Sequence, residues 1–483
     1  MIAAFIRDLQ ALLPAAAVLT AREDVTPYET DGLSAYRCQP GVVVLPETEA
    51  QVIAILQRCH AAAVPVIARG AGTGLSGGAL PRSDAVLLGL AKLNKIIHLD
   101  PLARTARVQP GVRNLAISEA AVAHGLYYAP DPSSQIACSI GGNVAENSGG
   151  VHCLKYGLTV HNVLRVRAVT ISGEVLEIGG DSLDSPGYDL LALLHGSEGM
   201  LAVVTEITVK LLPKPERAQV LLAAFDSVEK AGAAVGAIIA GGILPAGLEM
   251  MDKLAIHAAE AFIHANYPLD AEAILLVEVD GANEEVSEDM RRIHDILATS
   301  GATTIRSAHD EAERLLFWAG RKNAFPAVGR LSPDYYCMDG TIPRRALPAV
   351  LRGIADLSEA YGLRVANVFH AGDGNLHPLI LYDANSPGEL QKTEAFGARI
   401  LELCVRHGGA ITGEHGVGIE KIDQMCVQFQ ALELAIFHAI KAAFDPTALL
   451  NPGKAVPTLQ RCAELGAMHV HAGQLRHPEL PRF

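Results

Sequence analysis

Paired cysteine motifs, long apolar runs and an excess of positive charge are all missing from this sequence of 483 residues. The net charge of -14 argues against a nucleic-acid partner, because phosphate binding requires a basic face. No run of about 18 apolar residues occurs, so a membrane span is not expected. The absence of any CxxC pair disfavours a zinc ribbon or an iron–sulfur cluster held by this chain alone, and it fits a reducing compartment. The eight scattered cysteines stand at positions 38, 59, 138, 153, 337, 404, 426 and 462.

A targeting segment is not evident at the start of the sequence. Arg7, Asp8 and Gln10 interrupt the apolar character of the first residues, so a signal peptide is not expected. Half of the residues are apolar and no low-complexity tract stands out. These features predict a cytoplasmic protein of two or three domains that contacts a membrane only through a partner.

The pattern of apolar residues divides the chain into four parts. Residues 1–37 are predicted to form a helical lead-in, and residues 38–216 alternate short β-branched strands with helices. A Pro-Lys-Pro cluster at 213–215 marks the boundary to residues 217–455, where helices and strands alternate as in an α+β domain. Residues 456–483 form a tail, for which a surface position is favoured over a second metal site. The tail histidines are His469, His471 and His477.

Glycine is concentrated in segments next to short predicted strands. Gly72, Gly74 and Gly77 satisfy GxGxxG directly after a strand, but Pro81 and Asp84 follow too soon for the helix that a Rossmann loop opens. We therefore expect a loop whose backbone N–H groups approach a cofactor pyrophosphate without a helix. A plain bend between strands is the alternative.

Two further glycine-rich segments follow, at residues 127–150 and 195–215. Pro130 stiffens the entry to the first of them, and Asn143 and Asn147 supply amide donors and acceptors for a ring system. Three such segments around short strands predict a cofactor that lies extended across one domain.

Two histidines flank the turn-forming sequence AGDGN between two predicted strands. A hairpin of this length is expected to place His370 and His377 across from each other, about 4.5–5.5 Å apart at Cβ, where they can share an ion. Glu414 offers a third ligand, and the adjacent His415, with a pKa near ~6.5, is suited to take a substrate proton. Spacing alone leaves open a polar turn with two structural histidines, and a ligand or loop-stabilising role for His415.

Four long strings carry a resemblance to known proteins: RGAGTGLSGGALP, PDPSSQIACSIGGNVAEN, RKNAFPAVGRLSPDYYCMDGTIPRRALP and FHAGDGNLHP. The sequence resembles FAD-binding proteins of the vanillyl-alcohol-oxidase type over nearly all of residues 20–483. Within them it is similar to the FAD-linked subunits of bacterial glycolate oxidases (glycolate dehydrogenases) and to D-lactate and D-2-hydroxyglutarate dehydrogenases. The resemblance implies an α+β fold with a vanillyl-alcohol-oxidase type FAD-binding domain and an α+β substrate cap domain.

The same resemblance implies FAD held by the three glycine-rich segments, with Asn451 closing from the cap domain. Some relatives link FAD covalently to a histidine at the position of Thr73, so non-covalent FAD is expected here. The residues assigned to FAD are Arg69, Gly70, Ala71, Gly72, Thr73, Gly74, Ser76, Gly77, Pro130, Asp131, Ser133, Ser134, Gly141, Gly142, Asn143, Asn147, Gly149, Gly150, Glu198, Gly199 and Asn451.

The resemblance also implies a divalent metal on His370, His377 and Glu414, for which Zn²⁺, Mn²⁺ and Fe²⁺ all remain open. Arg321 matches the arginine with which relatives hold the substrate carboxylate through two parallel hydrogen bonds. Without the resemblance, a solvated helix residue is the simpler interpretation of Arg321. Weaker candidates for the carboxylate are Lys322 and Arg330.

Two departures from the family pattern bear on the substrate. Phe325 and Cys337 stand where hydroxyglutarate-using relatives carry a threonine and a lysine, which disfavours a second carboxylate. The predicted reaction is therefore FAD-dependent oxidation of a small 2-hydroxy acid, glycolate first and D-lactate second, with His415 as base. A D-2-hydroxyglutarate-type dehydrogenase, a metal-dependent hydrolase and a non-catalytic FAD-binding subunit are the alternatives.

Reduced flavin must then be reoxidised, and the sequence offers neither cluster-binding cysteines nor a nicotinamide site. Electrons are expected to leave to another protein rather than to oxygen. The resemblance implies a flavin-binding sister subunit and an iron–sulfur subunit that feed a membrane quinone pool.

Overall fold

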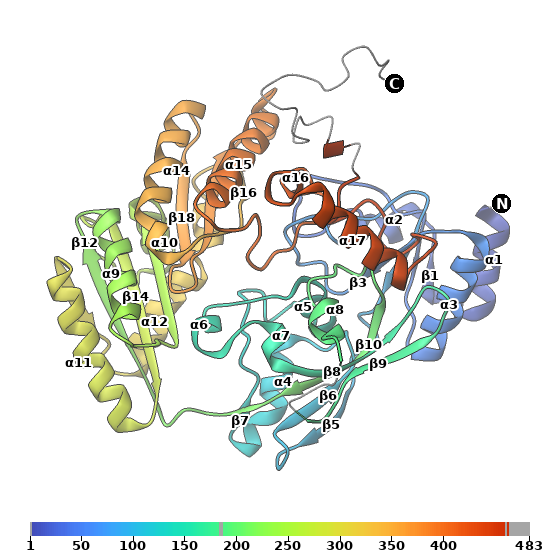
Figure 1. The fold of residues 1–483 in the computed structure, drawn as a ribbon, viewed down its shortest axis with the longest axis horizontal. Helices are drawn as coiled ribbons and strands as arrows, with labels where there is room; N and C mark the ends of the chain where they lie inside the picture. Colours follow the sequence, from blue (N-terminus) through green and yellow to red (C-terminus); the bar gives the residue numbers. More distant parts are fainter. Residues whose placement is uncertain (1, 183–186, 459–460, 463–483) are drawn as a thin grey trace.

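The computed structural model describes residues 2–182, 187–458 and 461–462. Figure 1 shows two units side by side: an N-terminal unit, mostly blue to teal, and a C-terminal unit, mostly green to orange. Both contain helices and sheets, as the α+β prediction requires. Within the described ranges, no helix is long and apolar enough to cross a membrane.

The N-terminal unit is built on two main sheets. A four-stranded sheet has the order β1-β2-β4-β3, in which β2, β4 and β3 run parallel, and a five-stranded antiparallel sheet has the order β5-β6-β10-β8-β9. The strands are β1 (Val18–Leu19), β2 (Val42–Val44), β3 (Val66–Arg69), β4 (Val86–Gly89), β5 (Ile96–Asp100), β6 (Thr105–Val108), β8 (Val163–Val169), β9 (Val175–Gly179) and β10 (Val203–Lys210), with the small pair β7 (Leu126–Tyr127) and β11 (Leu212–Pro213).

Short helices and turns connect these strands. The predicted strand–helix–strand pattern after Gly41 is confirmed as β2, α3 and β3. The predicted helical lead-in also contains β1, which pairs with β2, so it completes the first sheet. The helices are α1 (Ile2–Leu12), α2 (Arg22–Val25), α3 (Glu49–Ala62), α4 (Asn114–Ala121), α5 (Ile140–Glu146), α6 (Cys153–Tyr156), α7 (Thr159–Asn162) and α8 (Leu190–Leu194), with 3-10 turns at Ala15–Ala17, Thr26–Tyr28 and Val122–His124.

The C-terminal unit is built on one antiparallel sheet with the order β15-β12-β14-β13-β18-β19-β16, and β17 also pairs with β19. Its central strands are buried on both faces: Leu221, Ala223 and Phe225 of β12 enter one core, and the alternate residues Val220 and Leu222 enter the other. The strands are β12 (Arg217–Phe225), β13 (Gly247–Asp252), β14 (Ala273–Gly281), β15 (Thr304–Ser307), β16 (Asp334–Cys337), β17 (Gly340–Thr341), β18 (Val365–His370) and β19 (Asn375–Tyr382).

Helices cover both faces of this sheet. Residues of α9, α11, α14 and α15 contribute to the first core, and residues of α10, α12 and α13 contribute to the second. The helices are α9 (Val228–Ala240), α10 (Lys253–Ile263), α11 (Asn283–Thr299), α12 (Glu311–Lys322), α13 (Ala324–Val328), α14 (Leu347–Tyr361), α15 (Glu389–Arg406), α16 (Met425–Gln428) and α17 (Ala431–Phe444), with a 3-10 turn at Arg344–Ala346.

The chain returns to the N-terminal unit before it ends. Figure 1 shows α17 lying against that unit, where Ile440 and Phe444 pack on its core. The sequence placed residues 445–454 at the end of the C-terminal domain, and the structure shows that this segment also contacts the N-terminal unit. Leu450 forms a parallel bridge with Val66, the first residue of β3, and its side chain and that of Leu449 complete the apolar core of the first sheet.

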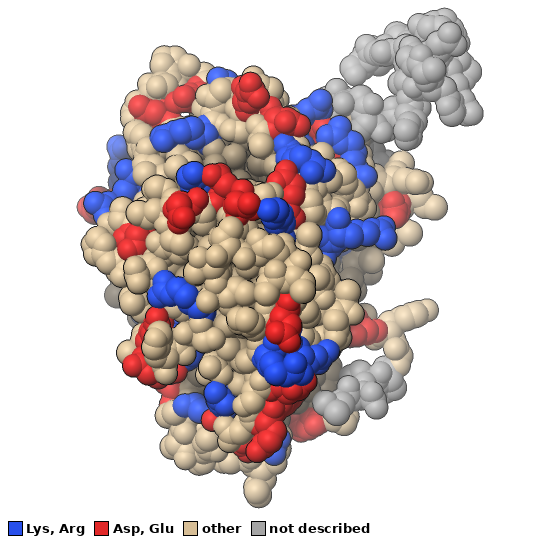
Figure 2. All heavy atoms as spheres, turned by 90° about the vertical axis from the view of Figure 1, so that its left-hand side faces the viewer, with Lys and Arg blue, Asp and Glu red and all other residues tan. Residues whose placement is uncertain are grey.

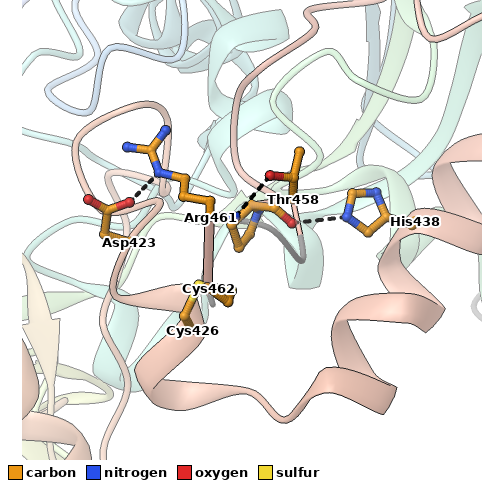
Figure 3. The surroundings of a disulfide bond; sticks show 7 residues. Asp423, Cys426, His438, Thr458, Arg461 and Cys462 are labelled. Carbon is orange, nitrogen blue, oxygen red and sulfur yellow. Dashed lines mark hydrogen bonds and ion pairs between the residues drawn. A yellow bond between two sulfur atoms is a disulfide. The ribbon is translucent and has the colours of Figure 1, made fainter. Parts of the chain in front are cut away.

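The described part of the tail contacts residues in and near α16 and α17. Cys462 forms a disulfide with Cys426, Arg461 pairs with Asp423, and the His438 ring lies 2.9 Å from the carbonyl oxygen of Pro457 (Figure 3). The sequence shows these cysteines only as two of eight scattered ones, and their spacing did not indicate that they pair. The tail histidines His469, His471 and His477 lie outside the described residues.

Charges of both signs are mixed on the face of the C-terminal unit that Figure 2 shows. Lysine and arginine side chains lie next to aspartate and glutamate side chains, and a broad field of one sign is not seen on this face.

A buried polar network joins the two units at His152. Its Nδ1 lies 2.9 Å from Asp131 Oδ2 and its Nε2 lies 3.2 Å from Glu278 Oε1. Glu278, from β14, also accepts hydrogen bonds from Arg314 and Trp318 of α12. Burial disfavours the charged imidazolium, but the two flanking carboxylates outweigh burial and raise the pKa of His152 to about 10.

This network predicts a pH-dependent contribution to stability. Because the pKa is higher in the folded protein, the contribution of His152 is complete below about pH 6.5 and is lost as the pH rises through about 10. We expect the unfolding free energies of the wild type and His152→Gln, measured in urea, to converge over this range. A difference that stays constant from pH 7 to pH 10 would contradict the assignment.

Candidate active site

A cavity of about 460 Å³ lies where the two units meet. The N-terminal unit contributes glycine-rich segments to its wall, and the C-terminal unit contributes Arg321, His370, His377, Glu414 and His415. The residues predicted to bind FAD that line it are Arg69, Gly70, Ala71, Gly72, Thr73, Gly74, Ser133, Ser134, Gly141, Gly142, Asn143, Glu198 and Gly199.

The other residues predicted to bind FAD lie behind this wall. Asn451 donates to the carbonyl oxygens of Gly78 and Glu198, so it braces the loops rather than facing the cavity. The Asp131 carboxylate is engaged by His152, and the Asn147 side chain accepts from the Val160 N–H. The predicted residues outside the cavity lining are Ser76, Gly77, Pro130, Asp131, Asn147, Gly149, Gly150 and Asn451.

The wall of the cavity suits a large polar cofactor. A Cβ built on Gly74 would meet open space, since nothing lies within 4 Å of it. The side-chain oxygen and nitrogen of Asn143 are buried, and neither has a hydrogen-bond partner among the described residues. Such an amide in a cavity wall is available to a bound group. These observations fit the predicted FAD.

The second glycine-rich segment differs from the prediction in its backbone. The sequence indicated an extended glycine-rich loop, but Ile140–Glu146 is a helix, α5. Ser139 caps its first turn by accepting from the Gly142 N–H, and Asn147 ends it in the left-handed conformation at φ 55°. Ile140 and Val144 are fully buried, so packing and both caps offset the low helix propensity of Gly141 and Gly142.

The residues predicted to hold a metal lie together in one cluster, in a different strand register from the one expected. His370 of β18 faces Asn375, and His377 of β19 faces Val368, so the two histidines are diagonal rather than opposite neighbours. Their rings still approach each other, with centroids 5.0 Å apart. The histidines are diagonal because the turn consists of the four residues 371–374, which pairs His370 with Asn375 instead of His377.

Glu414 completes the cluster. Its Oε1 lies 3.0 Å from His377 Nε2 and 3.3 Å from His370 Nε2. Ligands about 2.0–2.2 Å from one tetrahedral ion are separated by similar distances. A Cβ at Gly149 would lie only 2.6 Å from Glu414 Oε2, so glycine at that position lets the two units close around the cluster. The donor set of two imidazoles and a carboxylate therefore fits the predicted divalent metal.

Glu249 organises this cluster, and the sequence analysis missed it. Its Oε1 lies 2.8 Å from His370 Nδ1, which leaves His370 Nε2 directed at the cluster. Its Oε2 lies 2.6 Å from Arg321 Nη2, and both side chains are only 1% exposed. Although burial opposes it, the charges of His370 and Arg321 keep the pKa of Glu249 below its usual range. The signal available in the sequence was an acid between the apolar residues of LEMMD, a strand that ends in a second acid, Asp252.

His415 lies beside the cluster with an available nitrogen. Its ring stacks on His377 at an interplanar angle of 9°, and its buried Nδ1 has no hydrogen-bond partner in the described part of the chain. Burial, opposed by Asp339, lowers the pKa of His415 to about 4, below the value of ~6.5 assumed from sequence. The imidazole is therefore neutral at pH 7.

Asp339, also missed from the sequence, holds the loop that carries Glu414 and His415. The backbone N–H groups of both residues donate to its carboxylate, and Lys421 Nζ lies 2.9 Å from Oδ2. Asp339 and Lys421 are completely buried. Burial alone would raise the pKa of Asp339, but Lys421 holds it well below its usual range. An aspartate in the apolar context CMDGTI gave only a weak signal.

Glu198 holds the same loop from the N-terminal unit. Its two carboxylate oxygens accept from the N–H groups of Val417 and Gly418, each at 2.7 Å. The sequence assigned Glu198 to FAD, whereas its carboxylate here is engaged by the loop. Glu146, which was not predicted, lines the cavity beside it, and burial together with Glu198 raises the pKa of Glu146 well above its usual range.

Comparison with known proteins identifies the family of this chain. The family model described as FAD binding domain matches residues 40–179, and the model described as FAD linked oxidases, C-terminal domain, matches residues 214–455. The chain belongs to the FAD-linked oxidases. This confirms the predicted family and cofactor class.

Two relatives of this FAD-linked oxidase are informative. The glycolate oxidase subunit GlcD of Escherichia coli strain K12 is 68% identical over 471 residues, which cover 98% of this chain and 94% of the relative. The D-lactate dehydrogenase of Anaerostipes hadrus is 32% identical over 447 residues, which cover 90% of this chain and 94% of that protein.

A solved structure of p-cresol methylhydroxylase with bound substrate has the same fold. It superposes with a TM-score of 0.80 and covers 95% of this chain and 97% of its own. At 18% identity this likeness shows the fold alone, and it supports the predicted vanillyl-alcohol-oxidase type architecture.

Proposed function

We propose that this FAD-linked oxidase oxidises glycolate to glyoxylate, accepts D-lactate as a second substrate, and passes the electrons to a partner protein. The observation that carries the proposal is the meeting of Arg321, His415 and the His370–His377–Glu414 cluster in the wall of one cavity lined by glycine-rich segments. The identity to a glycolate oxidase subunit supports the choice of substrate class.

FAD is assigned to the glycine-rich walls of the cavity. When bound there, it accepts two electrons and the C2 hydrogen of the hydroxy acid. The segment from Arg69 to Gly74 offers backbone N–H groups to the pyrophosphate, and the unpartnered amide of Asn143 offers a donor and an acceptor. Thr73 cannot form a histidyl link, so we propose non-covalent FAD.

A divalent ion, Zn²⁺, Mn²⁺ or Fe²⁺, is assigned to His370, His377 and Glu414. Bound there, it polarises the hydroxyl oxygen of the substrate. Glu249 orients His370 for this role by holding its Nδ1. The buried carboxylates of Glu249 and Glu414, on either side of His370, make this point in the site favourable for a cation.

Two side chains act directly on the substrate. Arg321 Nε makes no hydrogen bond to any described residue and is available to the substrate carboxylate. His415, neutral at pH 7, takes the hydroxyl proton, and the nearby Asp339 carboxylate stabilises the imidazolium that results.

Phe325 limits the size and charge of the substrate. It lines the cavity, and its ring makes an edge contact with His377, with centroids 6.1 Å apart. An apolar ring at this point offers no partner to a second carboxylate, which supports glycolate and D-lactate over D-2-hydroxyglutarate.

The partner is proposed from the relatives. The word subunit in the name of the Escherichia coli relative supports an assembly of several chains. We propose a cytoplasmic complex with a flavin-binding sister subunit and an iron–sulfur subunit, through which electrons reach a membrane quinone pool.

The test is an anaerobic visible spectrum of the purified protein before and after each hydroxy acid is added. We expect a flavin band that glycolate bleaches fastest and D-lactate more slowly. Bleaching by D-2-hydroxyglutarate alone would overturn the substrate choice. A protein without a flavin band after reconstitution with FAD would favour a metal-dependent hydrolase, and a stable band that none of the three acids bleaches would favour a non-catalytic FAD-binding subunit.

A further inference from the structure

The proposed reaction leaves a proton on His415, whose side chain is half-buried and whose Nδ1 is out of contact with solvent. The C2–H and O–H bonds of the hydroxy acid both break. The C2 hydrogen and two electrons pass to FAD, and the hydroxyl proton passes to His415. A proton that leaves from the buried Nδ1 needs a path through the protein.

A second cavity, of about 240 Å³, lies next to the first. Leu75 lines both cavities, and Cys337 lines the second. The Cys337 sulfur lies within 4.8 Å of ring nitrogens of His377 and His415, so the second cavity begins beside the catalytic cluster. A water molecule takes about 30 Å³, so the cavity has room for several.

Tyrosine hydroxyls lead from this cavity to the surface. Tyr336, next to Cys337 on β16, lines the cavity, and its hydroxyl interacts with the hydroxyl of Tyr36 and with Glu420. Tyr36 donates to Glu394 Oε1 at 2.6 Å, and Glu394 lies partly exposed on α15. Each hydroxyl is both a donor and an acceptor, so a proton can pass along the row without either tyrosine becoming charged.

Glu420 is the titratable group at the inner end of this row. Its side chain is 1% exposed, and neither oxygen has a fully formed hydrogen bond to a described residue. Burial raises the pKa of Glu420 to about 8, with Lys421 and Tyr336 opposing the rise and Asp339 and Asp31 adding to it. Lys421 Nζ lies 3.8 Å away and also contacts Asp339, which holds the His415 loop.

We propose that the proton released in each turnover leaves through the second cavity and along Glu420, Tyr336 and Tyr36 to Glu394. This pathway rests on the proposed function for the source of the proton. The pathway runs from the loop at His415 to the partly exposed carboxylate of Glu394 on α15.

The test follows flavin bleaching and proton release together in one anaerobic stopped-flow experiment on the FAD-loaded protein. Glycolate is mixed in weakly buffered solution with phenol red as the proton probe. In the wild type we expect the two rate constants to be equal. In Tyr336→Phe and Tyr36→Phe we expect proton release to lag, so that the ratio of its rate constant to that of bleaching falls at least tenfold.

Tyr335→Phe is the matched control, because Tyr335 lines the same cavity but its ring contacts Phe325. In Tyr335→Phe the ratio of the proton-release rate constant to the bleaching rate constant should stay at one. Tyr36 is only partly buried, so Tyr36→Phe can be used alone if Tyr336→Phe does not fold.

Synchronous release in both path variants would overturn the pathway, as would a wild type that keeps the proton after bleaching. A wild type that no 2-hydroxy acid bleaches would instead overturn the proposed function.

Discussion

Replacing His415 with asparagine is expected to lower the rate constant of flavin bleaching by glycolate about a thousandfold, within the range of about 10²–10⁴ that general base catalysis supplies. The purified protein should stay yellow, because the FAD assignment rests on the glycine-rich segments and not on this side chain. Anaerobic stopped-flow absorbance at saturating glycolate measures the rate, and the flavin band measures occupancy.

The control for this prediction is His294→Asn, a surface histidine whose side chain is 54% exposed. It should bleach at the wild-type rate. If His415→Asn keeps more than a tenth of the wild-type rate, His415 is not the base. If it loses the yellow colour, the side chain has a structural role that the geometry does not indicate.

Replacing Asp339 with asparagine is expected to be comparably severe, for a different reason. The carboxylate accepts from the backbone N–H groups of Glu414 and His415 and pairs with the buried Lys421. An amide removes the carboxylate that lies 2.9 Å from that ammonium group, which costs about 3–5 kcal/mol when one member of a buried pair is removed. The loop also loses one of the two carboxylates that hold it, so we expect at least about a hundredfold slower bleaching and less bound metal.

Urea unfolding, elemental analysis of metal per flavin and stopped-flow bleaching measure these three effects. Asp334→Asn is the matched control, because Asp334 begins β16, the strand that precedes Asp339, and its carboxylate accepts only from the Ala384 N–H among the described residues. It should stay near the wild type in all three measurements.

The double variant Asp339→Asn with Lys421→Met separates the two roles of Asp339. Removing both charges should restore most of the stability, since a buried pair replaced by neutral groups costs little. The double variant should not recover the bleaching rate or the metal content. If it recovers the bleaching rate and the metal content, Asp339 serves only to neutralise Lys421.

The sequence predicted most of the secondary structure because burial leaves a periodic pattern. The apolar runs GVVVLP and AVLLGL became the parallel strands β2 and β4, and VLRVRAVTI became β8. It missed α5, because glycine content indicated a loop and the caps that stabilise this helix act through backbone geometry. It also placed His370 and His377 opposite each other, whereas the turn length makes them diagonal.

The candidate site was predicted unevenly. Residues in distinctive strings, such as Arg69 to Gly74, His370, His377, Glu414 and His415, line one cavity as expected. Glu198 and Asn451 also lie at the junction of the two units, but they hold loops instead of facing a cofactor. The sequence motifs that contain Glu198 and Asn451 indicate a functional role for these residues but do not indicate which atoms their side chains contact.

What the sequence determined by itself was the family, the alternation of strands and helices and the residue types that carry the chemistry, because these depend on local order along the chain. Only the tertiary structure decided the carboxylate partners. Glu249, Asp339 and Glu198 act on residues between 72 and 220 positions away. A buried carboxylate is stable only where folding brings donors or cations to it, and no local pattern specifies which ones those are.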